Sequence, residues 1–155
     1  MKQIFLVACL TLAISPLLAQ NDPWVGIWKL NVAKSRYTGM TGPKSETRTV
    51  VAKGNGYQVT YEGIAADGSR ISYSLTSNFD GKDSPISGTA PFGADTIATK
   101  RVDEYTITSV IKKAGKEIRT VVNVVSKDGK VTTQTGKGTN EQGQPVGYTA
   151  VWDKQ

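Results

Sequence analysis

Residues 56–77 read GYQVTYEGIAADGSRISYSLTS and predict two β-strands with a tight turn between them. Apolar and polar residues alternate with a period of two in both halves, which is typical of half-buried strands. The apolar side chains on one face are Tyr57, Val59 and Tyr61 in the first half, and Ile71, Tyr73 and Leu75 in the second. Between them, Asp67-Gly68 supplies the positive φ that a hairpin turn requires. The stretch therefore predicts an antiparallel hairpin.

The same pattern continues in both directions along the chain, with dense β-branched residues and closely spaced turn pairs such as Asp128-Gly129. No sustained helical period follows residue 19. The expected strands cover residues 24–32, 46–53, 56–64, 70–79, 95–102, 104–112, 116–125, 130–137 and 145–153. The sequence thus predicts an all-β, antiparallel up-and-down meander of about eight to ten strands.

Two edges of such a meander would be left unpaired unless it closes on itself. Closure as a β-barrel pairs the last strand with the first. A two-sheet β-sandwich is the alternative. Two stretches are expected to be long loops, Arg36–Lys44 and the Pro- and Gly-rich Ser84–Ala94.

The N-terminal residues are typical of a secretory signal peptide. One positive charge at Lys2 precedes a short apolar run, which ends at the small residue Ala19 before polar residues begin. We expect cleavage after Ala19, or after Gln20, and export to the periplasm or the extracellular space. The apolar run is shorter than the roughly 20 residues of a membrane-spanning helix, which disfavours a stable anchor. Cys9 lies too early to be a lipidated N-terminus.

Composition narrows the classes of function. Removing the first 19 of 155 residues leaves 136 residues, which is enough for one domain with a hydrophobic core. It also lowers the net charge from +6 to +5, because the removed segment holds Lys2 and no acidic residue. Residues 20–155 contain no His and no Cys, so they offer no disulfide, thiol nucleophile or imidazole ligand. The basic residues are spread out without interleaved aromatics, which disfavours nucleic-acid binding. We expect no catalytic residues, no metal site and no cofactor.

The segment Gly26-Ile27-Trp28 matches the Gly-x-Trp of the first strand of lipocalins and other calycin barrels. With its continuation to Ser35, and with Gly136–Val146, the chain resembles small secreted bacterial lipocalin-like proteins of largely uncharacterised function. The resemblance covers nearly all of residues 20–155 and implies a single lipocalin-like β-barrel domain there. It also implies that Trp28 closes one barrel end as a structural plug, with Gly26 allowing close approach.

In that family a basic residue of the last strand stacks on the indole. Here the final strand offers only Lys154, while Arg101 and Arg119 lie on other strands, so the identity of any such cation stays open.

The function expected from this resemblance is non-enzymatic binding of a small, mostly apolar molecule inside the barrel. The candidate cavity residues are the large side chains of the apolar faces, namely Tyr57, Tyr61, Tyr73, Leu75, Tyr105 and Ile107. The same side chains could instead fill a solid core. The alternative function is interaction with, or inhibition of, another envelope protein through the loop around Phe92. The sequence leaves the oligomeric state open.

Overall fold

The chain forms ten β-strands in a computed structural model that describes residues 22–140 and 142–155. The expected signal peptide, with Cys9 and Ala19, lies outside the described residues. The strands are β1 (Gly26–Thr38), β2 (Ser45–Lys53), β3 (Gly56–Ile64), β4 (Arg70–Ser77), β5 (Asp80–Thr89), β6 (Thr96–Arg101), β7 (Thr106–Lys113), β8 (Lys116–Val125), β9 (Val131–Thr139) and β10 (Pro145–Lys154). A short 3₁₀ turn, η2 (Pro91–Gly93), joins β5 to β6.

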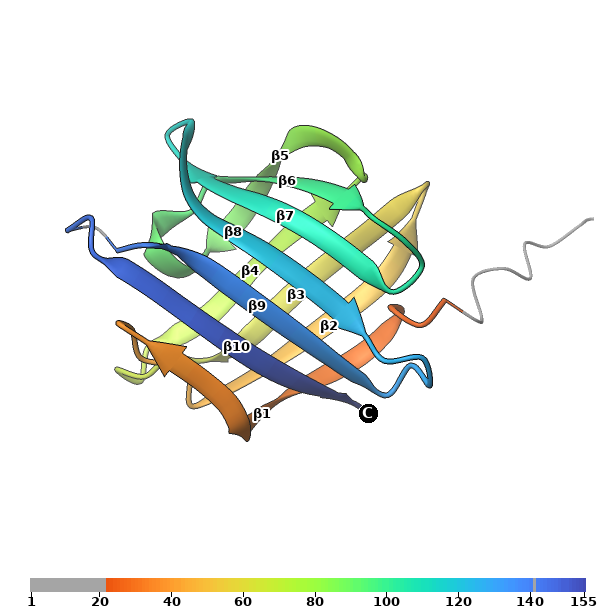
Figure 1. The fold of residues 1–155 in the computed structure, drawn as a ribbon, viewed down its shortest axis with the longest axis horizontal. Helices are drawn as coiled ribbons and strands as arrows, with labels where there is room; N and C mark the ends of the chain where they lie inside the picture. The colour runs from red at the N-terminus through yellow and green to blue at the C-terminus, as the bar shows by residue number, and fades with distance from the viewer. Residues whose placement is uncertain (1–21, 141) are drawn as a thin grey trace, which may run out of the picture.

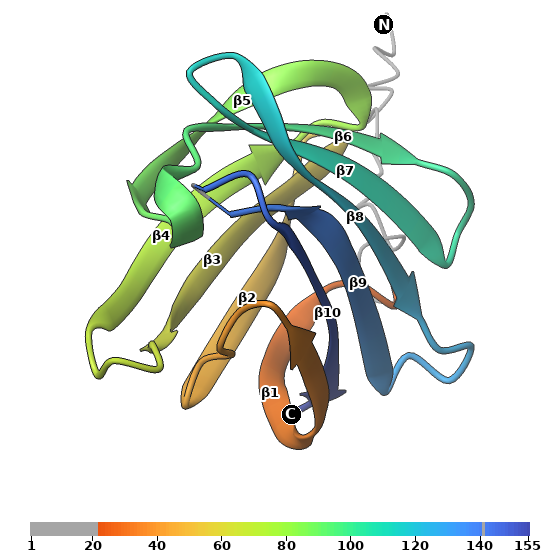
Figure 2. The same cartoon turned by 60° about the vertical axis from the view of Figure 1, so that its left-hand side comes forward.

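The strands form a closed antiparallel barrel, in which each strand pairs with its neighbours in the sequence and β10 pairs with β1. Figures 1 and 2 show the strands winding around one common interior. Leu30 lies opposite Trp152 across the closing pair. The predicted barrel is therefore confirmed, and the two-sheet sandwich is not formed.

Both predicted long loops contain strand residues. Residues 80–89 form β5, although Ser84–Ala94 was predicted to be a loop. In β5, Ser84 is the only buried residue, and Pro85 and Gly88 interrupt the sequence, so the strand lacks the alternation of apolar and polar residues. Its extended conformation depends on pairing with β4 and β6. Strand β1 likewise continues to Thr38 beyond a register shift between Asn31 and Arg36.

The antiparallel meander sorts the connections between the two barrel ends. The β1–β2, β3–β4, β5–β6, β7–β8 and β9–β10 connections share one end, which we call the loop end. The other end, which we call the closed end, receives the chain before β1 and the C-terminus of β10. The core is built from the inward faces and includes three tryptophans, Trp24, Trp28 and Trp152.

Candidate ligand-binding cavity

A stack of two indoles and one guanidinium lies across the barrel interior. Trp28 is fully buried on β1 and Trp152 is buried on β10. Arg48 of β2, only 4 % exposed, places its Cζ 5.5 Å from the centre of the Trp28 ring and 4.8 Å from that of Trp152. Its Nη2 also donates a hydrogen bond of 2.5 Å to Oγ1 of Thr132. The cation–π contacts and this hydrogen bond offset the cost of burying the charge.

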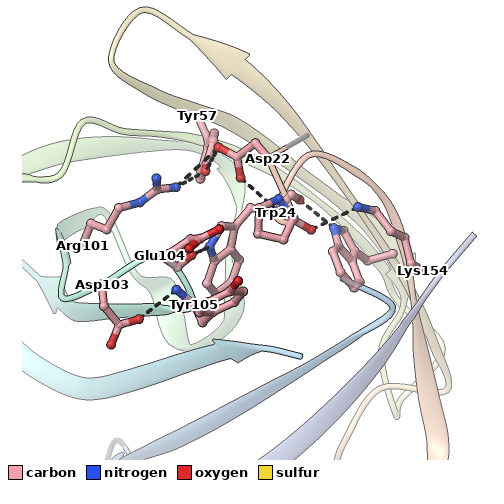
Figure 3. Close-up of polar contacts among 10 residues, drawn as sticks. Asp22, Trp24, Tyr57, Arg101, Asp103, Glu104, Tyr105 and Lys154 are labelled. Carbon is pink, nitrogen blue, oxygen red and sulfur yellow. Dashed lines mark hydrogen bonds and ion pairs between the residues drawn. The ribbon is translucent and has the colours of Figure 1, made fainter. Parts of the chain in front are cut away.

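The closed end is sealed by the residues that precede β1 (Figure 3). The Trp24 indole nitrogen donates to the Glu104 carbonyl over 2.9 Å, and the Trp28 indole nitrogen donates to the Trp24 carbonyl over the same distance. Lys154 of β10 donates to the Pro23 carbonyl over 3.0 Å. These bonds connect the segment before β1 to the β6–β7 connection and to the last strand.

A polar cluster of Asp22, Tyr57 and Arg101 completes the closed end (Figure 3). The Tyr57 hydroxyl donates to Asp22 and accepts from Arg101, and Arg101 Nη2 lies 3.6 Å from Asp22 Oδ2. The Arg101 Cζ also lies 4.8 Å from the centre of the Phe79 ring. Burial, with a smaller contribution from Asp22, raises the pKa of the Tyr57 hydroxyl. The polar groups of Asp22, Tyr57 and Arg101 thus serve as hydrogen-bond and ion-pair partners for one another.

On the other side of the stack lies a cavity of about 290 Å³ that extends toward the loop end. Trp152 lines this cavity and Trp28 does not, so the stack separates the cavity from the closed end. The aliphatic wall comes from strands β4 to β7 and β10, with Ile71, Leu75, Ile86, Ile97, Ile111 and Ala150. Aromatic rings add to it: Tyr37, Tyr73, Phe92, Tyr148 and Trp152.

Tyrosine rings form a layer inside the barrel. Tyr73 stacks on Tyr61 with ring centres 4.5 Å apart, and Tyr61 meets Trp152 edge to face at 6.1 Å. Tyr37 stacks on Tyr148 with ring centres 6.1 Å apart. Burial raises the pKa of the Tyr73 and Tyr148 hydroxyls, so both are neutral hydrogen-bonding groups at neutral pH.

Three charged side chains line the cavity, Glu46, Arg70 and Arg119, and Arg70 forms an ion pair with Glu62 over 3.6 Å. Burial raises the pKa of the Glu46 carboxyl to about 7, although the positive charge of Arg48 acts in the opposite direction. Arg119 of β8 is 7 % exposed, and burial lowers the pKa of its guanidinium. Its Cζ lies 4.1 Å from the centre of the Phe92 ring and 5.5 Å from that of Tyr148. Its Nε and Nη2 have no hydrogen-bond partner.

The six predicted cavity residues divide between the two sides of the stack. Tyr73 and Leu75 line the cavity. Tyr61 is buried behind Tyr73 and does not line it. Tyr57 belongs to the closed-end cluster, and Ile107 pairs with Arg101 at the same level.

Tyr105, the sixth, also lies at the closed end beside Trp24, where its backbone nitrogen donates to Asp103 (Figure 3). Four of the six candidates, Tyr57, Tyr61, Tyr105 and Ile107, therefore do not line the cavity. Tyr57, Tyr105 and Ile107 lie at the closed end because strands tilt around a barrel and equal inward faces reach different depths.

Sequence reasoning missed Arg48 and Glu46 and considered Arg119 only as a partner of Trp28. The period-two alternation of strand faces could have found the two arginines, because Arg48 shares a buried strand face with Val50, and Arg119 shares one with Val121 and Val125. The expectation that charged residues face solvent outweighed it. The cation on Trp28 that was left open is Lys154, whose Nζ lies 5.0 Å from the ring centre, together with Arg48.

Comparison with known proteins identifies no family: no family model matches the chain, and no curated protein sequence matches it. Among solved structures, zebrafish ileal bile acid-binding protein complexed with cholic acid aligns over 86 % of this chain and 99 % of its own, with 10 % identity and a TM-score of 0.49. Lobster apocrustacyanin A1 aligns over 88 % of this chain with 12 % identity and a TM-score of 0.45, and apocrustacyanin C1 over 90 % with the same identity and score.

The chain spans 63 % of the apocrustacyanin A1 chain and 64 % of the apocrustacyanin C1 chain. At 10–12 % identity these likenesses concern the fold alone and carry no information about a ligand.

Across 22–140 and 142–155, no group of three or more Asp, Glu, His or Cys side chains is placed to hold a metal ion. No helix in the described part of the chain has the length and apolar character that crossing a membrane requires. The cavity, with its mostly apolar wall and the charged side chains of Glu46, Arg70 and Arg119, is the candidate functional site.

Proposed function

We propose that this protein is a non-enzymatic binding protein that holds a small, mostly apolar molecule in the cavity between Trp152 and the loop end. The observation that carries the proposal is the cavity itself. Its volume of about 290 Å³ lies near the lower limit of ligand pockets, and aliphatic and aromatic side chains dominate its wall. A few polar points in an apolar wall are what a small-molecule site uses to orient its ligand.

The alternative role, interaction through the loop around Phe92, has less support. The Phe92 ring packs on the Arg119 guanidinium, and the residue is half-buried. A docking loop would present its aromatic side chain to solvent. The role of a binding protein acting in the periplasm or outside the cell rests on the N-terminal signal pattern. N-terminal sequencing of the exported protein tests that part, with Gln20 or Asn21 expected as the first residue.

Titration with N-phenylnaphthylamine, an uncharged apolar fluorescent probe, tests the binding function. We expect saturable binding to the folded protein. Ile111→Trp adds bulk at the cavity wall and should weaken binding strongly. Val122→Trp is the matched control, since Val122 is 41 % exposed on the outside of β8, and its binding should equal that of the unaltered protein. Absence of saturable binding, or equal weakening in both variants, would contradict the proposed function.

A further inference from the structure

Arg119 carries a buried positive charge that the protein leaves without an anionic partner. The three ion pairs among the described residues do not include it. The Phe92 and Tyr148 rings and a side-chain hydrogen bond with Tyr148 stabilise its charge, while Nε and Nη2 have no hydrogen-bond acceptor. Leaving a buried charged group without acceptors is costly, and buried arginines are therefore normally paired.

The two unpaired nitrogens form one geometric unit. In a guanidinium, the N–H groups of Nε and Nη2 point in the same direction along one edge of the plane. That edge is a fork that matches the two oxygens of a carboxylate. The centre of the Phe92 ring lies 4.1 Å from Cζ of the guanidinium, and this contact leaves Nε and Nη2 without a hydrogen-bond partner.

We propose that the ligand is an amphipathic monocarboxylate, whose carboxylate accepts both hydrogen bonds of the Arg119 fork and whose apolar body occupies the cavity. This inference rests on the proposed function and adds the chemical class of the ligand. The length of the apolar body is limited by the cavity of about 290 Å³.

The composition of the cavity favours one negative charge over several. The unpaired edge of Arg119 offers a single fork, Glu46 lines the same cavity, and the other lining arginine, Arg70, already has Glu62 as an ion-pair partner at 3.6 Å. When it is ionised, the Glu46 carboxylate repels a second negative charge on the ligand. A phosphate monoester or a dicarboxylate would therefore be bound less well than a monocarboxylate of the same size.

Phe92 is the cover of this site. The Arg119 Nε and Nη2 are buried, so a ligand reaches them only when the neighbouring side chains move. Phe92 lies in the three-residue η2 turn with a left-handed φ of 62°, and no side-chain hydrogen bond caps the turn. Within it, the Ala94 nitrogen donates to the Pro91 carbonyl over a long 3.3 Å. Displacement of this short turn opens a path from the loop end to the fork.

Calorimetric titration with two probes of equal chain length tests the proposal. Decanoate carries the carboxylate, and methyl decanoate has nearly the same shape without the charge. In the unaltered protein we expect decanoate to bind about 10- to 100-fold more tightly than the ester, as expected for a charge-assisted hydrogen-bonded pair. In Arg119→Met this preference should vanish while the ester still binds. Arg101→Met, which removes an arginine of the closed end, should keep the preference.

The outcomes separate this inference from the proposed function. Equal binding of decanoate and ester in the unaltered protein overturns the carboxylate assignment but leaves apolar binding intact. Loss of the preference in Arg101→Met also overturns it, because net charge rather than the fork would then decide. Absence of binding by either probe overturns both proposals. The free energy of unfolding of Arg119→Met is compared with that of the unaltered protein. We expect no loss of stability, because the variant removes a buried charge that has no anionic partner.

Discussion

The ammonium group of Lys154, next to the last residue of the chain, lies 5.0 Å from the centre of the Trp28 ring on the first strand. The same nitrogen donates to the Pro23 carbonyl over 3.0 Å. Lys154 thereby joins the two ends of the described chain, and Figure 3 shows it on the other side of Trp24 from Arg101. The first and last strands of the barrel are therefore held together by side chains as well as by backbone pairing.

Replacing Trp28 by Ala should destabilise the fold by about 3–5 kcal/mol, because it removes a fully buried indole and leaves a cavity. Urea unfolding at neutral pH measures the free-energy difference. Ile27→Ala is the control on the adjacent, outward-facing position, where Ile27 is 49 % exposed and the expected change is within about 0.5 kcal/mol. A Trp28→Ala midpoint equal to that of the unaltered protein would show that the indole does not seal the barrel.

Gly26→Ala should destabilise the protein by roughly 1–3 kcal/mol, for two separable reasons. Gly26 has a φ of 139°, which side chains other than glycine rarely adopt, and a Cβ there would lie 2.8 Å from Cε of Lys154. Measuring the same substitution in a Lys154→Ala background removes the clash and keeps the backbone strain. We expect the cost to fall in that background without disappearing. An unchanged cost would assign it wholly to the backbone.

Glu46→Gln should change how stability depends on pH. The pKa of Glu46 is raised to about 7 in the folded protein, so ionisation above that pH opposes folding, and this cost is absent well below the unfolded value of about 4.5. Arg48 is the charged side chain that acts on Glu46, and ionised Glu46 in turn raises the pKa of Tyr37, Tyr61, Tyr73 and Tyr148.

The variant should therefore be more stable than the unaltered protein at about pH 8.5, with the difference shrinking as the pH falls toward about 4. Chemical unfolding across this range measures it. A constant difference at all pH values would mean that Glu46 has an ordinary pKa.

Phe92→Ala should affect the rate of ligand entry to the Arg119 fork and the affinity for the ligand in opposite directions. Removing the ring uncovers the guanidinium, so stopped-flow mixing with decanoate should show faster association than in the unaltered protein. The ring also contributes to the apolar wall, so methyl decanoate should bind somewhat more weakly to the variant. Pro91→Ala, which changes an exposed residue of the same turn, is the comparison. Equal association rates in all three proteins would show that Phe92 does not cover the site.

The sequence by itself determined which faces of most strands are buried, where most turns lie and how many strands there are to within one or two. These properties are local, because the side-chain period of two and the glycines of tight turns act over neighbouring residues. Strand β5 escaped prediction because its residues lack that local pattern, and its extended form depends on pairing with β4 and β6.

Only the tertiary structure decided the depth at which each inward side chain lies. Tyr57 and Tyr73 share an inward face in the sequence pattern, yet Tyr57 meets Asp22 and Arg101 at the closed end, whereas Tyr73 lines the cavity. The stagger between tilted strands sets this depth, and it arises from pairing around the whole barrel rather than from any single strand. The same stagger places Arg48 between two indoles from opposite ends of the chain and leaves Arg119 facing an aromatic ring instead of an acid.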